Sequence, residues 1–162
     1  MGSGKSTIGN IIAKKLGRDF RDSDHFIEER TGVDIARIFD VEGEAGFRDR
    51  ESKALKDLLG QNDQVIATGG GSVLRKENQA LLRSRGYIVF LDTSVNQQLQ
   101  RLHRDKKRPL LQTENPRLQL ESLFEARHPI YLDLADLAVK TDRKLARKLA
   151  SDIIGQLPQH LL

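Results

Sequence analysis

Apolar residues recur three or four positions apart in some stretches of the chain and crowd together in others. The first spacing predicts helices, and the short crowded runs predict buried strands. Helices are predicted over residues 6–16, 44–59, 76–85, 94–103, 119–126 and 144–157. Extended segments are predicted over residues 19–24, 64–68, 87–91 and 137–141. Because apolar strands alternate with helices, we expect an α/β fold, a three-layer sandwich with helices on both faces of a parallel sheet.

The length and composition of the chain limit the class of protein but do not identify its function. The 162 residues suffice for a single domain with a buried core, and no apolar run is long enough to cross a bilayer. The chain has no cysteine, which excludes disulfides, thiolate metal sites and a cysteine nucleophile, and which suits a reducing cytosol. The formal net charge of +4 fits a partner rich in phosphate or carboxylate, such as nucleotide or nucleic acid.

The first predicted helix begins within the sequence GSGKST, which matches the second half of a phosphate-binding loop, G-x-x-x-x-G-K-[ST]. A helix N-terminus offers N–H groups and a positive dipole to phosphate. Lys5 would add a charge there, and the Ser6 hydroxyl is suited to Mg²⁺. The first glycine of the motif would fall before Met1. The alternative is a Gly/Ser tail before a capped helix, but four consecutive matches at a helix start favour the loop.

Asp22 and Asp24 lie at the end of the first predicted extended segment, on either side of Ser23. In a strand, residues two apart point to the same side, and open α/β sheets bind ligands at the ends of their strands. Phosphoryl transfer can use one carboxylate near Mg²⁺ and another at the acceptor hydroxyl. The alternative is an Asx turn that caps a helix starting near His25. Beside a phosphate-binding loop, the two aspartates indicate a role in phosphoryl transfer rather than a helix cap alone.

Arg48 lies on the predicted inward stripe of the helix 44–59, extended back by one turn. This stripe consists of Val41, Ala45, Arg48, Ser52, Leu55 and Leu59. A guanidinium that faces the interior needs an anionic partner, and it binds a carboxylate through two parallel hydrogen bonds. An internal salt bridge is the commoner case. A substrate carboxylate becomes a comparable candidate for the partner of Arg48, because the helix follows Asp22 and Asp24.

Two loops add candidate chemistry. TGGG, residues 68–71, follows a buried strand, and its glycines let backbone N–H groups approach an anion or a ring. A tight turn, the alternative, would need fewer glycines. RDKKRPLL, residues 104–111, is either a solvated charged run or a lid, over residues 105–120, that delivers Arg108 to a phosphate. Arg127 follows the helix 119–126, and we assign His128 and Tyr131 to packing or to the surface.

The sequences GSGKST, FRDSDHFIE, FDVEGEAGFRDRE, TGGGSV, RPLL and RHPIY occur in the order and spacing seen in shikimate kinases. The chain resembles this family over essentially its whole length, especially the bacterial enzymes of aromatic amino acid biosynthesis. The resemblance implies a P-loop fold like that of the nucleoside-monophosphate kinases. It also implies transfer of the ATP γ-phosphate to the 3-hydroxyl of shikimate, with Mg²⁺. We expect a cytoplasmic monomer that binds neither nucleic acid nor membrane.

The resemblance further implies a role for each matched residue. The expected ATP-binding residues are Gly2, Ser3, Gly4, Lys5, Ser6, Thr7, Arg108 and Lys144. The expected shikimate-binding residues are Asp24, Arg48, Gly70 and Arg127. Mg²⁺ is expected at Ser6 and, through water, at Asp22. The expected catalytic residues are Lys5, Asp24 and Arg108, with Asp24 as the base. An internal ion pair at Arg48, or Lys5 and Asp24 on opposite sides of the molecule, would contradict this interpretation.

The chain departs from the family at its N-terminus, where family members carry an apolar strand and Gly-Pro before the loop. We expect that Met1 is an internal codon taken as the start, or that the chain was trimmed, so that the first strand is missing. That strand is expected in the middle of the sheet. Its loss would expose two strand edges and cost several kcal/mol, against a typical stability of about 5–15 kcal/mol.

Two other functions stay open at this point. Gluconate kinase, a related P-loop kinase, would share the loop but has less use for two arginines, because its substrate is not the same ring acid. A nucleic-acid-binding or partner-regulated module would suit the net charge. The chain has only eight Phe and Tyr residues, so no aromatic platform for stacking on bases supports that alternative.

Overall fold

The computed structural model describes residues 2–102 and 115–162, which form two compact units. Of these residues, the α1 unit comprises 4–72 and 143–162, and the α6 unit comprises 2–3, 73–102 and 115–142. The elements of the α1 unit are α1 (Lys5–Leu16), β1 (Asp19–Asp22), α2 (Ser23–Thr31), α3 (Ile35–Leu59), β2 (Gln64–Ala67), α7 (Ala146–Ile154) and η3 (Gln159–Leu161). The elements of the α6 unit are α4 (Lys76–Arg85), β3 (Val89–Asp92), α5 (Val95–Leu102), α6 (Pro116–Leu134) and β4 (Leu137–Lys140). The short helix η1 (Ser72–Leu74) spans the boundary between the units.

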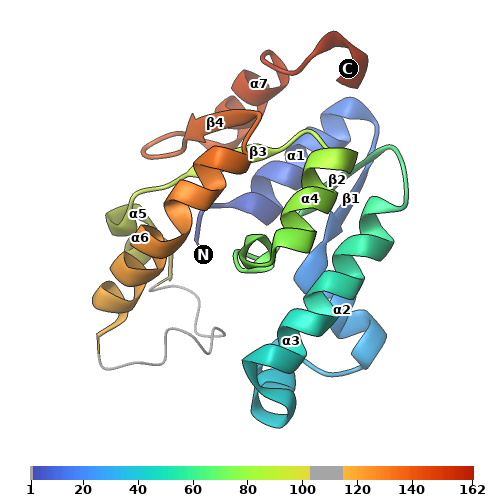
Figure 1. Cartoon of the computed structure of the whole chain (residues 1–162). Coiled ribbons are helices and arrows are strands. Elements are labelled where there is room, and N and C mark those ends of the chain that lie inside the picture. Colours follow the sequence, from blue (N-terminus) through green and yellow to red (C-terminus); the bar gives the residue numbers. More distant parts are fainter. Residues whose placement is uncertain (1, 103–114) are drawn as a thin grey trace. The chain divides into compact units, whose positions relative to one another are not determined.

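In the α1 unit, β1 and β2 form a parallel pair on which α1 packs (Figure 1). The register aligns Asp19 with Gln64 and Asp22 with Ala67, so both strands end at the same edge. Gly9 allows α1 to approach β1 closely, because a Cβ at this position would lie 2.7 Å from the ring of Phe20. Helix α7 covers another side of α1, where Lys15 Nζ donates a hydrogen bond to Ser151 Oγ at 2.7 Å.

The apolar core beside this strand pair lies between α2 and α3. Its buried members are Ile27, Ile38, Phe47 and Ala54. Phe39 packs against them, with its ring centroid 4.7 Å from that of Phe47. The core fixes α3 against α2, and therefore holds the second half of α3 near the end of β1, from which α2 begins.

In the α6 unit, β3 and β4 form a second parallel pair, with Val89 opposite Leu137. Just beyond the strands, the buried hydroxyls of Thr93 and Thr141 share a hydrogen bond of 2.6 Å. Helix α5 packs on α6, and Arg117 in the first turn of α6 donates to Asn96 Oδ1 and pairs with Glu121. The α/β class and the parallel pairing predicted from the sequence are thus confirmed.

Several predicted element boundaries were wrong. Residues 23–24 belong to helix α2 and not to a strand, because Asp22 caps that helix. The stripe on α3 was also misplaced, since Val41 is 65% exposed and the buried face runs instead through Phe47, Arg48, Glu51, Ala54, Leu55 and Leu58. Helix α6 is much longer than predicted, and it continues through Pro129.

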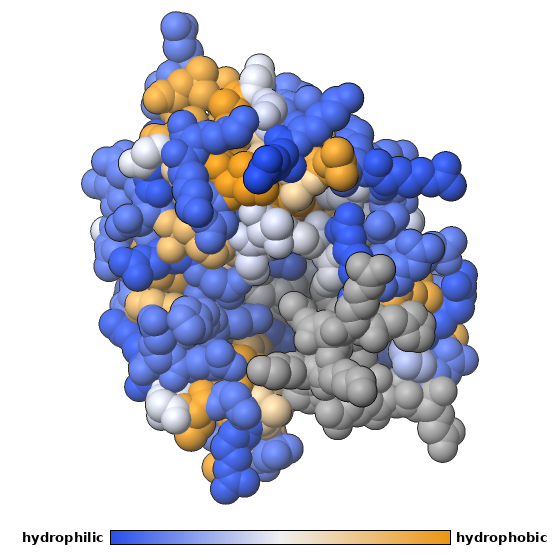
Figure 2. All heavy atoms as spheres, turned by 180° about the vertical axis from the view of Figure 1, so that it is seen from behind, coloured by the Kyte–Doolittle hydropathy of each residue, from blue (hydrophilic) through white to orange (hydrophobic). Residues whose placement is uncertain are grey.

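None of the helices within residues 2–102 and 115–162 is both long and apolar enough to cross a membrane. The face in Figure 2 presents mostly hydrophilic residues, and its hydrophobic residues are scattered in small patches.

Candidate active site

The N-terminus of α1 meets the end of β1 in the α1 unit. Gly4 precedes the helix in the left-handed conformation (φ 87°, ψ 19°), and no side chain of the described residues caps the helix there. Lys5 is the first helical residue. The hydroxyl of Ser6 donates a hydrogen bond of 2.6 Å to Asp22 Oδ2, which ties the start of α1 to the end of β1. The loop residues and the aspartates therefore lie at the same end of the strand pair.

Asp22 and Asp24 meet through the cap of α2. Asp22 Oδ1 accepts a hydrogen bond of 3.0 Å from the backbone N–H of Asp24, which lies in the first turn of α2. The helix cap, the alternative considered from the sequence, is therefore the correct local structure, and the argument from a shared strand face was wrong. Both side chains are half-buried near the start of α2.

Arg48 is 8% exposed and ion-paired within α3. Nη1 donates to Glu51 Oε2 at 2.8 Å, and Nη2 donates to Glu44 Oε1 at 3.0 Å. Burial disfavours the charged form and acts to lower the pKa of Arg48, but Glu51 and then Glu44 outweigh burial, so the pKa is raised. The guanidinium stays charged at any physiological pH.

From the sequence, we expected that an internal ion pair at Arg48 would contradict the kinase interpretation, and the structure contains such an ion pair. This expectation was wrong, because a buried guanidinium needs a counter-charge whether or not it also binds a ligand. The ion pair therefore does not exclude substrate binding. Two carboxylates also do not exhaust five N–H donors. Arg48 Nε is buried and has no hydrogen-bond partner among the described residues.

Gly69 and Gly71 of TGGG pack on the charged side chains of this region. A Cβ on Gly69 would lie 2.5 Å from Glu51 Oε1 and 2.9 Å from Asp24 Oδ1, so both carboxylates approach the same point. A Cβ on Gly71 would overlap the guanidinium of Arg48. The loop is fixed by the N–H of Gly69, which donates to the buried Ser23 Oγ at 2.9 Å. These glycines are required by internal packing, which the sequence alone did not reveal.

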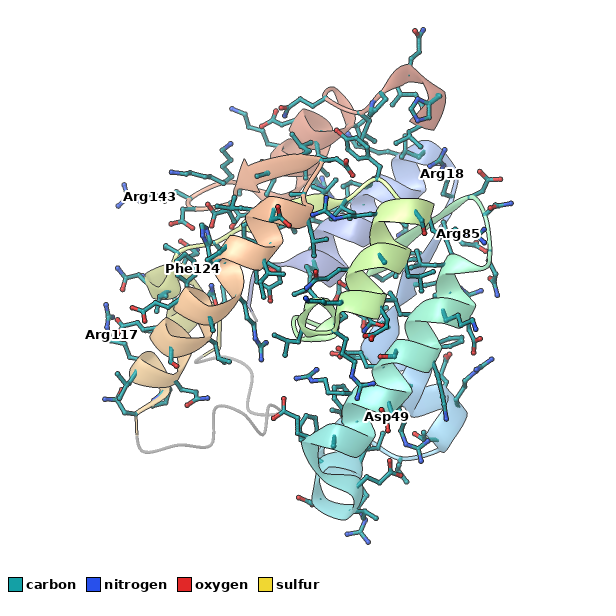
Figure 3. All side chains as sticks on the ribbon, viewed as in Figure 1. Arg18, Asp49, Arg85, Arg117, Phe124 and Arg143 are labelled. Atoms are coloured by element: carbon teal, nitrogen blue, oxygen red, sulfur yellow. The ribbon has the colours of Figure 1, made fainter. Side chains whose placement is uncertain are left out.

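A second ion pair lies on α3 near its kink at Gly43, whose φ of 68° and ψ of −175° are not helical. Arg50 donates from Nε and Nη2 to the two carboxylate oxygens of Glu42, at 2.7 and 2.5 Å. These hydrogen bonds lower the pKa of Glu42 and raise that of Arg50. Asp49, labelled in Figure 3, projects from the same helix and is exposed.

In the α6 unit, Arg127 is buried on α6. Its neighbour His128 lies 3.2 Å from Asp92 Oδ1 at the end of β3 and stacks on Phe124, which Figure 3 labels on the same helix. The prediction that His128 serves packing agrees with these contacts. Tyr131 packs against Phe90 of β3.

Gly2 belongs to the α6 unit, where its carbonyl accepts a hydrogen bond of 3.0 Å from Arg101 of α5. Ser3 is buried in the same unit. Thr7 and Lys144 are exposed in the α1 unit. Arg108 and residues 105–114 of the predicted lid lie outside the described residues, whereas residues 116–120 form the start of α6.

Glu44, Glu51 and Arg101 were not selected from the sequence. Glu44 and Glu51 could have been found, because they stand four residues before and three residues after Arg48, the spacings at which helical side chains meet. Arg101 carried no comparable signal, since its contact with Gly2 joins segments 99 residues apart.

A pocket of about 210 Å³ lies beside Ser6 and Asp22 and is lined also by Phe20, His25 and Phe26. Neither Asp24 nor Arg48 lines this pocket, so we assign it no role. Within the part of the chain that the structure describes, no three His, Asp or Glu residues are grouped to hold a metal ion.

Phosphate-loop residues at the start of α1, parallel strands, Asp22 at the end of β1 and Asp24 in the first turn of α2 define an α/β protein of the P-loop kinase class. The family model for shikimate kinase matches residues 1–158. The chain therefore belongs to the shikimate kinase family, whose enzymes phosphorylate shikimate with ATP.

Individual relatives agree with this assignment. The chain is 53% identical to a shikimate kinase of Vibrio cholerae serotype O1, over all of this chain and 93% of the relative. Its structure is similar to that of shikimate kinase from Acinetobacter baumannii in complex with shikimate. That comparison gives a TM-score of 0.93 at 45% identity and covers 98% of this chain and 91% of the other. Shikimate kinase from Bacteroides thetaiotaomicron gives a TM-score of 0.86 at 32% identity, covering 96% and 92% of the two chains.

Proposed function

We propose that this chain transfers the γ-phosphate of ATP to the 3-hydroxyl of shikimate, and that the reaction takes place at the start of α1. The observation that carries the proposal is the hydrogen bond between Ser6 and Asp22, which joins the phosphate-loop helix to the segment that bears Asp24. Family membership adds the substrates.

The phosphates of ATP would bind at the N-terminus of α1. The left-handed Gly4 turns the backbone into a helix that has no side-chain cap among residues 2–102 and 115–162, which suits an anion at its N–H groups. Lys5 supplies a positive charge in the first turn. Gly2, Ser3, Ser6 and Thr7 complete the proposed loop, and Arg108 and Lys144 remain further ATP contacts that rest on the resemblance alone.

Mg²⁺ would bind at the Ser6 hydroxyl and, through water, at Asp22. The hydroxyl and the carboxylate lie 2.6 Å apart, and they are hard oxygen donors of the kind that Mg²⁺ prefers. Few protein ligands are expected, because Mg²⁺ commonly keeps several waters and binds substrate phosphates. When bound, the ion would neutralise charge on the transferring phosphate.

Asp24 is the proposed base for the acceptor hydroxyl. Its position in the first turn of α2 is fixed by the bond from its N–H to Asp22 and by the packing of Gly69 against its carboxylate. A carboxylate held in this way can accept the hydroxyl proton as the oxygen attacks the γ-phosphorus.

Arg48 is the proposed ligand of the shikimate carboxylate. The guanidinium is buried and charged, and Nε has no hydrogen-bond partner among the described residues. Gly70 would face the ring from the neighbouring loop. Arg127 is retained as a second ligand on the resemblance alone. We further propose that the enzyme is a cytoplasmic monomer without nucleic-acid or membrane partners.

The test is a coupled assay of ADP release with ATP and Mg²⁺, in which shikimate, gluconate or no acceptor is added. The proposal predicts saturable turnover with shikimate alone, and a product that carries phosphate on the 3-hydroxyl by ³¹P and ¹H NMR. ADP release that does not require shikimate, or phosphate on another hydroxyl, would contradict it.

A further inference from the structure

We propose that Glu44 is an internal competitor of the substrate carboxylate, which holds Arg48 Nη2 until shikimate displaces it. The inference rests on the proposed function, in which Arg48 binds the carboxylate of shikimate. It adds a residue that sets how tightly that substrate binds.

The two carboxylates on Arg48 differ in how readily they can leave. The side chain of Glu51 is 1% exposed, so leaving Arg48 would separate a buried carboxylate from the guanidinium that pairs with it. The side chain of Glu44 is 58% exposed, so it can turn into water at little cost. Glu51 is therefore the fixed partner of the guanidinium, and Glu44 is the exchangeable one.

The charges around Arg48 also favour the departure of one carboxylate when a substrate carboxylate arrives. One guanidinium already faces Glu44 and Glu51, and Asp24 approaches Gly69 together with Glu51. A substrate carboxylate would be a further negative charge at this cluster. Departure of Glu44 would restore the balance, because one anion replaces another at Nη2.

The geometry of the guanidinium explains why the substrate would win the exchange. Glu44 is hydrogen-bonded to Nη2 alone, whereas the adjacent Nε is buried without a partner among the described residues. Nε and Nη2 form one edge of the guanidinium, and a carboxylate can take both N–H groups through two parallel bonds. Gly71 packs against the guanidinium, so the arginine is held in place during the exchange.

The decisive variant is Glu44→Gln, which keeps the shape of the side chain but removes its charge. We expect the dissociation constant of shikimate, measured by calorimetry, and its KM to fall by about two- to fivefold, the range that exposed ion pairs support. The KM for ATP should not change. A methyl ester of shikimate, which lacks the carboxylate charge, should gain no affinity from this substitution.

The matched control is Glu42→Gln, which makes the same chemical change two residues away and removes an ion pair with Arg50 instead. This control should leave the affinity for shikimate unchanged. An equal gain in both variants would overturn the proposal, because it would indicate a general effect of charge. Unchanged or weaker shikimate binding by Glu44→Gln would also overturn it, since Glu44 would then merely orient Arg48.

Failure of the proposed function can be recognised separately. If the unmodified protein does not phosphorylate shikimate, or if Arg48→Ala leaves the KM for shikimate unchanged, the role of Arg48 fails and the Glu44 proposal fails with it. If Arg48→Ala weakens shikimate binding and Glu44→Gln does not strengthen it, only the proposal for Glu44 is lost.

Discussion

Arg48 carries its charge into a buried position, and the partners that balance this charge decide what else the residue can bind. Desolvation of a guanidinium is costly unless a carboxylate compensates, and Glu51 supplies that compensation from one turn further along α3. A fixed internal partner and a binding role for Arg48 are therefore compatible. Glu44 is exposed and Nε has no hydrogen-bond partner among the described residues, so one edge of the guanidinium can accept a ligand if Glu44 leaves.

Gly71 is predicted to be intolerant of any side chain because of its contact with Arg48. In Gly71→Ala, the new Cβ would overlap the guanidinium, so either Arg48 or the loop must shift. We expect a loss of about 1–3 kcal/mol in the free energy of unfolding, from denaturant titration, together with a higher KM for shikimate.

The control for this prediction is Gly60→Ala. Its φ is −76°, and the nearest atoms to an added Cβ are backbone oxygens at 3.4 Å, so this change should leave both stability and KM nearly unaltered. Equal effects at the two positions, or none at Gly71, would show that the packing of Gly71 on Arg48 does not matter.

At the residue scale, the sequence predicted that Arg48 is buried but not what it binds. Burial follows from its place among apolar neighbours, whereas the choice between an internal and an external carboxylate depends on side-chain rotamers. For Asp22, in contrast, the contact itself could be predicted. Its hydrogen bond with Asp24 joins residues two positions apart, and the Asx-turn alternative described it correctly.

Helix α3 consists of two helical segments that meet at Gly43. The first segment packs Ile38 into the core with α2, and the second carries Arg48 and Glu51. A φ of 68° with an extended ψ is open to glycine and strained for other residues, so this glycine sets the direction between the two segments.

Gly43→Ala is predicted to lower the free energy of unfolding by about 1–3 kcal/mol, purely through backbone strain. Apart from its chain neighbours and the adjoining backbone of α3, no heavy atom of the described residues lies within 4 Å of an added Cβ at this position, so overlap with other parts of the structure is not expected to contribute. Gly86→Ala is the matched control, since Gly86 is extended (φ −140°) and its nearest neighbour would be 3.7 Å away. Similar stability of Gly43→Ala and the unmodified protein would contradict the interpretation of the kink.

At the element scale, periodicity was informative where apolar residues recur at helical spacing, as at Ile8, Ile12 and Leu16 of α1, which was predicted over residues 6–16 and is observed over Lys5–Leu16. Helix α4 was predicted with its observed bounds, Lys76–Arg85. Helix α2 was considered only as an alternative that starts near His25, because its large apolar residues, Phe26 and Ile27, are adjacent and make no helical stripe. Helix α6 continues past Pro129, beyond which Tyr131 packs on Phe90 of β3, a contact that no local pattern reveals.

At the scale of the whole molecule, alternating helices and apolar strands predicted the α/β class, and the shared motifs predicted the family. The partners of each strand could not be read from spacing, because β1 pairs with β2 and β3 with β4 across intervening helices. The meeting of Ser6 with Asp22 likewise depends on the packing of α1 on that first strand pair.

The central claim is that Asp24 accepts the proton of the shikimate hydroxyl beside the phosphate-binding start of α1. The most direct test is Asp24→Asn in the coupled ADP-release assay, with ATP binding measured separately by calorimetry. We predict that turnover falls by about 10²–10⁴-fold, the contribution typical of a general base, while the dissociation constant of ATP stays the same. Turnover near that of the unmodified protein would contradict the claim, because the reaction would then proceed without the carboxylate of Asp24.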